Sequence, residues 1–293
     1  MAEHYFRVAN IPVKPKSLIR SFLSNLSVTG WLITVNVFIF FLTFFLGMFF
    51  NVGDYLAIQA NNFFNNYYFW TILTSMFMHA SLLHLLANMF SLYFIGRFLE
   101  TLIGKKRFFW LYLISGIFAG LLFISFAFLF GNTELGSRLF GTMSTSAVGA
   151  SGAIFGIAGV LAFLTPRSKV YLLFGPVVAI IFQAVINNFI SSPALLNLIS
   201  IIITLYIFVC IFSMFSFGSI SKTALPLGIP LWVIPFIAIV PFMVVDLFLP
   251  AGKGTGMGNM GHLGGFIAGA IYGLYLRIKY PKKTEMISRR FSQ

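Results

Sequence analysis

Four polar side chains with catalytic potential lie in otherwise apolar stretches of the chain: Ser151, His262, His84 and Asn88. A serine hydroxyl becomes a nucleophile when an imidazole within hydrogen-bonding distance can accept its proton. Imidazole and amide N–H groups can stabilise the negative oxygen that forms when the hydroxyl attacks a carbonyl. Because polar groups inside apolar spans are costly and usually functional, we treat these four residues as candidate catalytic groups.

The spacing of these residues suggests how they could meet. Asn88 follows His84 by one helical turn, so the two side chains share a helix face. Ser151 begins one apolar run and His262 begins another, and each run carries glycines at intervals of four. Glycines at this spacing allow two helix backbones to approach closely. They lie at positions 152 and 156 and at positions 261, 265, 269 and 273. We therefore expect Ser151 and His262 on adjacent helices, at hydrogen-bonding distance.

Each of these residues also has a simpler interpretation. A lone serine in a glycine-rich helix usually serves packing, and a lone His or Asn in a membrane can bond to a neighbouring helix. All four groups are expected at the same depth on one side of a membrane, and this convergence favours a catalytic role. Asp246 is the one carboxylate that lies within an apolar span on the same side of the membrane as these four residues, and the sequence does not place it against His262. A Ser–His dyad is therefore the economical interpretation, since a third group mainly orients the base.

The composition requires a lipid environment. Of 293 residues, 59% are hydrophobic and only 9% are charged, whereas a soluble domain carries roughly 25% charged residues. A single Cys excludes an internal disulfide and argues against a thiolate zinc site. We expect no metal and no cofactor.

Eight apolar runs approach the length of about 20 residues that a membrane-spanning helix needs. They are residues 31–50, 82–98, 108–130, 148–164, 170–190, 195–215, 228–249 and 262–276. The predicted fold is an all-α, polytopic membrane helical bundle of about eight transmembrane helices. We divide the chain into an N-terminal tail (1–30), a transmembrane domain (31–277) and a basic C-terminal tail (278–293).

The basic residues predict the orientation. If the N-terminus is cytoplasmic and each run crosses once, all but two of the 19 Lys and Arg residues fall in the cytoplasm; the exceptions are Arg138 and Lys253. Both termini are then cytoplasmic and the candidate site opens to the extracytoplasmic side. The net charge of +13 is thus a topology signal and does not indicate nucleic-acid binding. The aromatic, Asn-rich stretch 51–78 suits an interfacial segment, and the absence of a signal sequence favours a prokaryotic cytoplasmic membrane.

Three motifs resemble those of the rhomboid family of intramembrane serine proteases. Residues 149–152 (Gly-Ala-Ser-Gly) resemble its GxSG motif, residues 261–265 (Gly-His-Leu-Gly-Gly) its GHxxG motif, and residues 79–88 its HxxxxHxxxN element. The GxSG match alone is weak evidence for the resemblance. Three matching motifs in this order, over residues 70–273, are specific evidence.

The resemblance implies a six-helix core and a role for each candidate. Ser151 would attack the scissile carbonyl, and His262 would accept its proton and later donate it to the leaving amine. His84 and Asn88, with the backbone N–H of Ser151, would stabilise the oxyanion. The expected substrates are single-span membrane proteins cut near the outer face. Three further positions match family features: a packing aromatic at Phe155, a structural carboxylate at Glu100, and an additional histidine of open role at His79.

Two features depart from the family pattern. Thr71 follows Trp70, where the family commonly has Arg, so the loop contacts of that Arg are in question. Three apolar runs lie between the Ser151 and His262 helices, where a six-helix core needs one. Any odd number of crossings keeps Ser151 and His262 at the same face of the membrane. We therefore expect an inserted pair of helices within residues 170–215. An alternative is that one of these runs is re-entrant or interfacial.

Two rival functions remain at the level of sequence. The first is an inactive rhomboid-like chaperone or trafficking factor, but such relatives lose the Ser or the His and this chain keeps both. The second is a channel or transporter, which would need more polar residues deeper in the spans; these are scarce.

Overall fold

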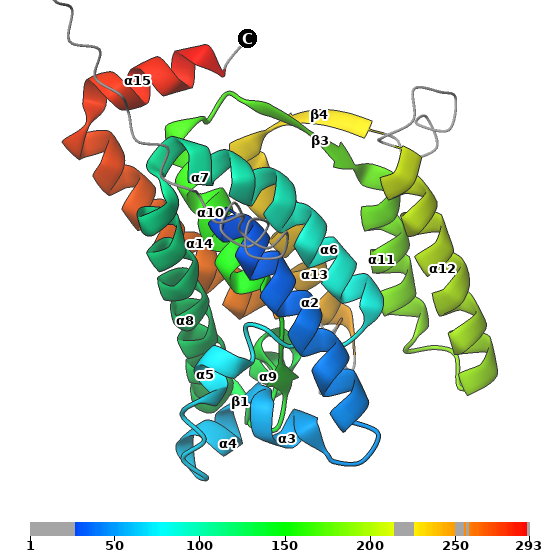
Figure 1. The fold of residues 1–293 in the computed structure, drawn as a ribbon. Coiled ribbons are helices and arrows are strands. Elements are labelled where there is room, and N and C mark those ends of the chain that lie inside the picture. Colours follow the sequence, from blue (N-terminus) through cyan, green and yellow to red (C-terminus); the bar gives the residue numbers. More distant parts are fainter. Residues whose placement is uncertain (1–26, 214–225, 250–254, 256–257, 292–293) are drawn as a thin grey trace, which may run out of the picture.

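The computed structural model describes residues 27–213, 226–249, 255 and 258–291, and it is a bundle of helices with two small two-stranded sheets (Figure 1). Helices occupy all eight apolar runs. The six that form the main bundle are α2 (Val28–Leu46), α6–α7 (Leu82–Ser91 and Arg97–Ile103, joined by a π-helical stretch), α8 (Lys105–Phe130), α10 (Ser151–Leu164), α13 (Ile234–Phe248) and α14 (Asn259–Lys279).

Within the described residues, five segments are long and apolar enough to cross a membrane. They are Val28–Leu46, Leu82–Ile103, Lys105–Phe130, Pro193–Cys210 and Leu231–Phe248. Helix α14 has 21 residues but is rich in glycine, whereas α10 has only 14. Many large apolar side chains on these helices are exposed, as lipid contact requires. The chain is an integral, multi-pass membrane protein.

Helix α10 forms the centre of the bundle. Most of its side chains are buried, and its most extensive contacts are with α14 and then α8. The glycines make the contact with α14 possible, because a Cβ atom at Gly265 would overlap the carbonyl oxygen of Gly152. A Cβ atom at Gly269 would overlap the carbonyl oxygen of Gly156 in the same way. The predicted glycine strips therefore face each other.

Two further helices, α11 (Phe174–Ile186) and α12 (Pro193–Ser213), lie within the residues where we expect an inserted pair. They stand beside the bundle and contact mainly each other (Figure 1). The side chain of Gln183 donates a hydrogen bond of 2.7 Å to Ser200 between them. Strand β3 (Lys169–Leu173) precedes α11 and strand β4 (Pro226–Pro230) follows α12 in the chain, and the two strands pair antiparallel. The helix predicted over residues 170–190 is therefore shorter than expected, because its first residues form β3.

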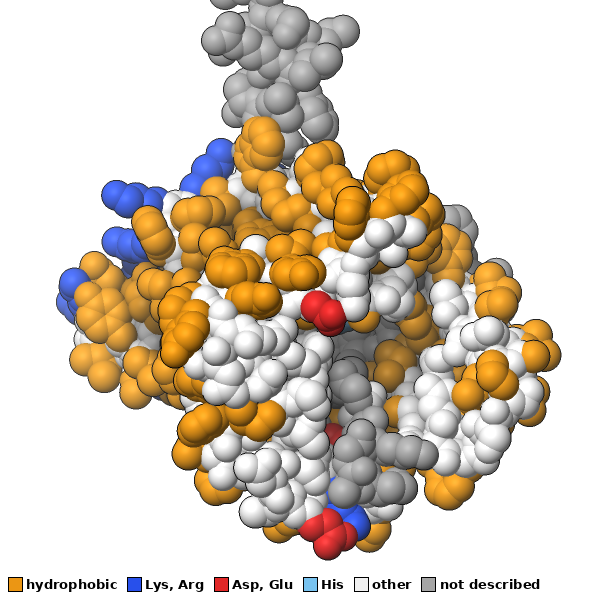
Figure 2. Space-filling view, turned by 90° about the horizontal axis from the view of Figure 1, so that it is seen from below, with side chains coloured by type: hydrophobic (Ala, Val, Ile, Leu, Met, Phe, Trp, Pro, Cys, Tyr) orange, Lys and Arg blue, Asp and Glu red, His pale blue; other side chains and the backbone are white. Residues whose placement is uncertain are grey.

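The segment between α2 and α6 folds against the loop that precedes Ser151. Strand β1 (Ile58–Gln59) pairs with β2 (Ser146–Ala147), and the Asn61 N–H donates to the Met143 carbonyl at 2.9 Å. The predicted interfacial stretch contains three short helices, α3 (Val52–Leu56), α4 (Ala60–Phe64) and α5 (Thr71–Thr74). Figure 2 shows this end of the bundle, where hydrophobic and uncharged atoms dominate.

The opposite end of the bundle carries α15 (Pro281–Arg290), a basic helix that lies across the ends of the others (Figure 1). Helix α14 continues to Lys279 before the chain turns at Tyr280. The Ser168 hydroxyl donates to the Phe291 carbonyl at 2.7 Å, and the Phe291 ring contacts Phe98 with centroids 4.9 Å apart. The segment predicted as a basic tail thus contains a helix that packs on the core.

Candidate active site

Ser151 and His262 lie together where α10 and α14 begin. Ser151 is the first residue of α10, and His262 is in the first turn of α14. The distance from Ser151 Oγ to His262 Nε2 is 2.9 Å, within hydrogen-bonding range. The close glycine contact between the helices sets this distance, because larger residues there would push the backbones apart.

Helix α10 is too short to cross the hydrocarbon core of a membrane by itself. Its 14 residues span about 21 Å at 1.5 Å per residue, whereas the hydrocarbon core is about 30 Å thick. The chain reaches Ser151 through the loop of residues 141–150, which is anchored by the Gly149 N–H donating to the Ser75 carbonyl at 2.8 Å.

Gly149 brings the His84 ring against the Ser151 loop. Its φ of +126° lies in the region that glycine adopts readily. A Cβ atom at this position would lie 2.8 Å from His84 Cε1 and Nε2, and 3.7 Å from Asn88 Nδ2. The Asn88 amide donates to the His84 carbonyl at 3.0 Å, within the same helix. His84 and Asn88 therefore border the backbone two residues before Ser151.

The His262 ring is held by an aromatic stack. The Phe155 ring, one helical turn after Ser151, lies 4.3 Å from the His262 ring with an angle of 12° between the planes. His262 Nδ1 is buried and has no hydrogen-bond partner among the described residues. Among the described residues, the His262 ring is thus oriented by packing and by the Ser151 contact, and no carboxylate bonds to its Nδ1.

Asp246, which the sequence left unplaced, connects α13 to α14. It is 3% exposed. Its Oδ1 accepts from the Thr255 N–H at 2.6 Å and its Oδ2 accepts from Asn259 Nδ2 at 2.8 Å. Asn259 is one turn before His262, so the carboxylate fixes the start of the helix that carries His262. We did not single out Asn259 from the sequence, although its position three residues before a candidate histidine was the available signal.

The other positions raised by the sequence have structural partners. The rings of His79 and His84 meet edge to face with centroids 5.1 Å apart. Burial, and to a smaller extent the nearby His84, lowers the pKa of His79 to about 4. Glu100 accepts bonds from the Val28 and Thr29 N–H groups at the start of α2. Thr71 is buried and donates to the Tyr68 carbonyl at 2.6 Å.

The contact between the Ser151 hydroxyl and the His262 imidazole can support nucleophilic acyl transfer. A hydroxyl in contact with a neutral imidazole is the arrangement that activates serine. Among the described residues, no group of three or more His, Cys, Asp or Glu could hold a metal ion.

The sequence of the chain matches a known protein family. The model of the Rhomboid domain matches residues 66–279. RHOMBOID-like protein 1 of Arabidopsis thaliana is 42% identical over 92 residues, which are 31% of this chain and 20% of that protein. Rhomboid protein 1, mitochondrial, of Saccharomyces cerevisiae is 35% identical over 107 residues, 36% of this chain and 28% of that protein.

A relative whose name describes it as inactive also matches. Inactive RHOMBOID-like protein 8 of Arabidopsis thaliana is 36% identical over 76 residues, 26% of this chain and 22% of that protein. The chain thus spans less than a third of the length of each of these relatives, while the domain model covers most of this chain. By that match, which includes the helices bearing Ser151 and His262, the chain belongs to the rhomboid family.

Proposed function

We propose that the protein is an intramembrane serine endopeptidase that cleaves membrane proteins by a Ser151–His262 dyad. The observation that carries the proposal is the 2.9 Å contact between Ser151 Oγ and His262 Nε2. His262 accepts the hydroxyl proton as Ser151 attacks the scissile carbonyl, and later donates a proton to the leaving amine. Water then hydrolyses the acyl-enzyme, with His262 as general base.

The oxyanion of the tetrahedral intermediate needs donors beside Ser151. His84, Asn88 and the Ser151 N–H are the proposed donors, since both side chains border the Gly149 backbone. Removal of one such donor typically lowers kcat by about 10²–10³-fold. The close fit of Gly149 against His84 supports the assignment, because a side chain there would displace the ring.

The proposed substrates are single-span transmembrane proteins that are cut near the extracytoplasmic face. A helical peptide hides its carbonyl groups in hydrogen bonds, so small or helix-destabilising residues near the cut would favour local unwinding. The distribution of Lys and Arg supports cytoplasmic termini and a site open to the other side. We propose a prokaryotic cytoplasmic membrane as its location.

The nucleophile is tested first with a fluorophosphonate probe, which reacts with activated serines and needs no knowledge of the substrate. Purified native protein should be labelled at Ser151, as read by mass spectrometry of the modified peptide. Ser151→Ala and His262→Ala should lose this labelling. Ser115→Ala is the matched control, because its hydroxyl is buried in the same bundle and has no hydrogen-bond partner among the described residues.

Cleavage of a single-span reporter in detergent then tests the enzyme class. Loss of cleavage in Ser151→Ala and His262→Ala, with cleavage retained in Ser115→Ala, is the expected result. Cleavage that survives Ser151→Ala would refute the nucleophile. A folded native protein that neither reacts with the probe nor cleaves any of several reporters would favour an inactive rhomboid-like protein.

A further inference from the structure

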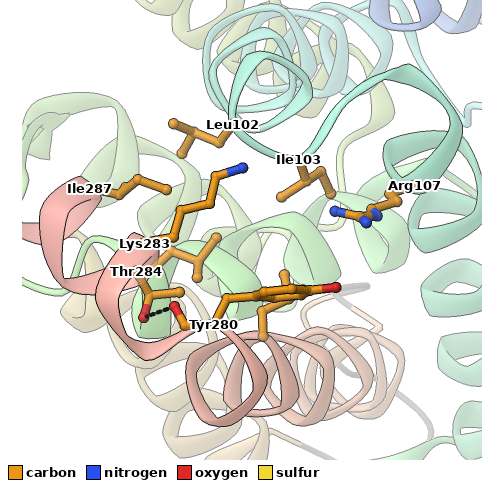
Figure 3. A pocket seen from close by; sticks show the side chains of 9 residues that line it. Leu102, Ile103, Arg107, Tyr280, Lys283, Thr284 and Ile287 are labelled. Carbon is orange, nitrogen blue, oxygen red and sulfur yellow. Dashed lines mark hydrogen bonds between the residues drawn. The ribbon is translucent and has the colours of Figure 1, made fainter.

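We propose a second site, at the basic end of the bundle, that binds the headgroup of an anionic phospholipid. A cleft of about 170 Å³ lies between α15 and the ends of α7, α8, α10 and α14 (Figure 3). It is far larger than the roughly 10–15 Å³ that one water needs. Its lining residues are Leu102, Ile103, Arg107, Leu164, Leu276, Tyr280, Lys283, Thr284 and Ile287. The site is separate from the Ser151–His262 pair, which lies where α10 and α14 begin.

Two cations face each other across this cleft. Arg107, in the first turn of α8, and Lys283, in the first turn of α15, point into it from opposite sides (Figure 3). The two nearby carboxylates of described residues are engaged elsewhere: Glu100 accepts from the start of α2, and Glu285 pairs with Arg289 at 2.6 Å. The cleft therefore offers two positive charges to a ligand that brings its own negative charge.

Most of the remaining lining of the cleft is apolar. Five of its nine lining residues are Leu or Ile, and they come from α7, α10, α14 and α15. The Thr284 hydroxyl donates to the Pro281 carbonyl at 3.0 Å, so it already has a partner. A pair of cations above an aliphatic wall matches a phosphodiester with attached hydrocarbon better than a free, fully hydrated anion.

The position in the bundle supports a lipid as the occupant. The starts of α8 and α15 and the end of α14 meet at this end, and these helices carry further basic residues. These are Lys105, Lys106, Arg277, Lys279, Lys282, Arg289 and Arg290. Lys and Arg just outside membrane spans attract anionic lipids. The exposed side chains of Ile278 and Met286, at 72% and 64%, place apolar surface beside the same charges.

The wall formed by α15 is fixed to the bundle. The Ser168 hydroxyl bonds to the Phe291 carbonyl at the end of α15, and the Phe291 ring packs on Phe98. Thr284, in its first turns, is buried. Because α15 is anchored at Thr284 and at Phe291, the backbone that carries Lys283 is held against the bundle, on the side of the cleft opposite Arg107.

The test measures lipid binding by the full chain in detergent, using native mass spectrometry with short-chain phosphatidylglycerol, phosphatidylcholine of the same chain length, and inorganic phosphate. Phosphatidylglycerol should bind tightest. Each of Arg107→Gln and Lys283→Gln should weaken it roughly fivefold, and the double variant about 25-fold. The matched control is Lys106→Gln with Lys282→Gln, which removes the same charge from neighbouring positions that do not line the cleft.

Three outcomes would overturn the proposal. Equal weakening by the control pair would show diffuse attraction to the basic end. Equal binding of phosphatidylcholine would show that charge is not recognised, and displacement of the lipid by inorganic phosphate at similar concentration would show a free-anion site. If the double variant does not fold, the two single variants carry the test, and Arg107→Lys should retain binding.

Discussion

At the scale of the residue, the orientation of His262 depends on packing. Its Nε2 contacts Ser151, while its Nδ1 has no hydrogen-bond partner among the described residues. In a triad a carboxylate would hold the ring from that side. Here the Phe155 ring lies nearly parallel to the imidazole at 4.3 Å and restricts its rotation. In the proposed dyad, this aromatic stack would supply the orientation that a third catalytic group usually gives the base.

Phe155→Ala should therefore lower kcat more than it raises KM. Stacking contributes about 0.5–1.5 kcal/mol, which corresponds to roughly a two- to tenfold loss in rate if the stack aligns the base. The rate of fluorophosphonate labelling at Ser151 should fall in parallel. Phe155→Tyr keeps the ring and should retain activity. An unchanged labelling rate in folded Phe155→Ala protein would mean that the stack does not orient His262.

A second prediction at this scale concerns Asp246, whose buried carboxylate accepts from Thr255 and Asn259. A hydrogen bond to a charged group contributes about 1.5–3 kcal/mol, and loss of the acceptor leaves buried donors unsatisfied. Asp246→Ala should lower the thermal unfolding temperature clearly, and Asp246→Asn less so because one acceptor oxygen remains. Asp54→Ala is the control, since Asp54 bonds to Asn51 in an exposed segment. Equal shifts for Asp246→Ala and Asp54→Ala would contradict the anchoring role.

At the scale of the element, the approach of α10 to α14 rests on particular glycines and not on glycine content. A methyl group at Gly265 or Gly269 would overlap backbone of α10, whereas one at Gly261 would meet its nearest atom at 3.7 Å. Gly265→Ala and Gly269→Ala should each lower the unfolding temperature and abolish labelling of Ser151. Gly261→Ala, in the same row of the same helix, should leave the unfolding temperature nearly unchanged. Similar destabilisation by all three would mean that glycine acts there through helix flexibility.

The same elements show what the sequence could predict. The fourfold glycine spacing and the apolar runs predicted the α10–α14 contact and the helical membrane bundle, because both depend on local periodicity. The strand at residues 169–173 was not predicted, since an apolar run of that length reads equally as helix when its partner is more than 50 residues away. Helix α15 was missed because its charged sequence has no apolar run. The Asp246–Asn259 bond was missed because the two residues are 13 positions apart on different helices and no repeated spacing links them.

At the scale of the whole molecule, the insertion divides the chain into a core and an attached hairpin. Helices α11 and α12 contact mainly each other, and the chain leaves and re-enters the core through the paired strands β3 and β4. In the register of that pair, Leu173 lies opposite Pro226. The two ends of the insertion therefore lie side by side, at the separation of adjacent strands, and the core can be closed without it.

Replacing residues 174–225 with Asn-Gly should leave the core folded, because a two-residue loop of this type joins antiparallel strands. Labelling of Ser151 by a fluorophosphonate should persist, and the unfolding temperature should change little, since few core contacts are removed. The control is the full chain with Asn-Gly inserted after Leu173, which tests the new sequence while keeping the helices. Loss of labelling in the shortened protein but not in the control, with the unfolding transition retained, would show that the reactivity of Ser151 depends on α11 and α12. Their role would then be to shape the approach to the α10–α14 site, because neither helix carries one of its candidate catalytic residues.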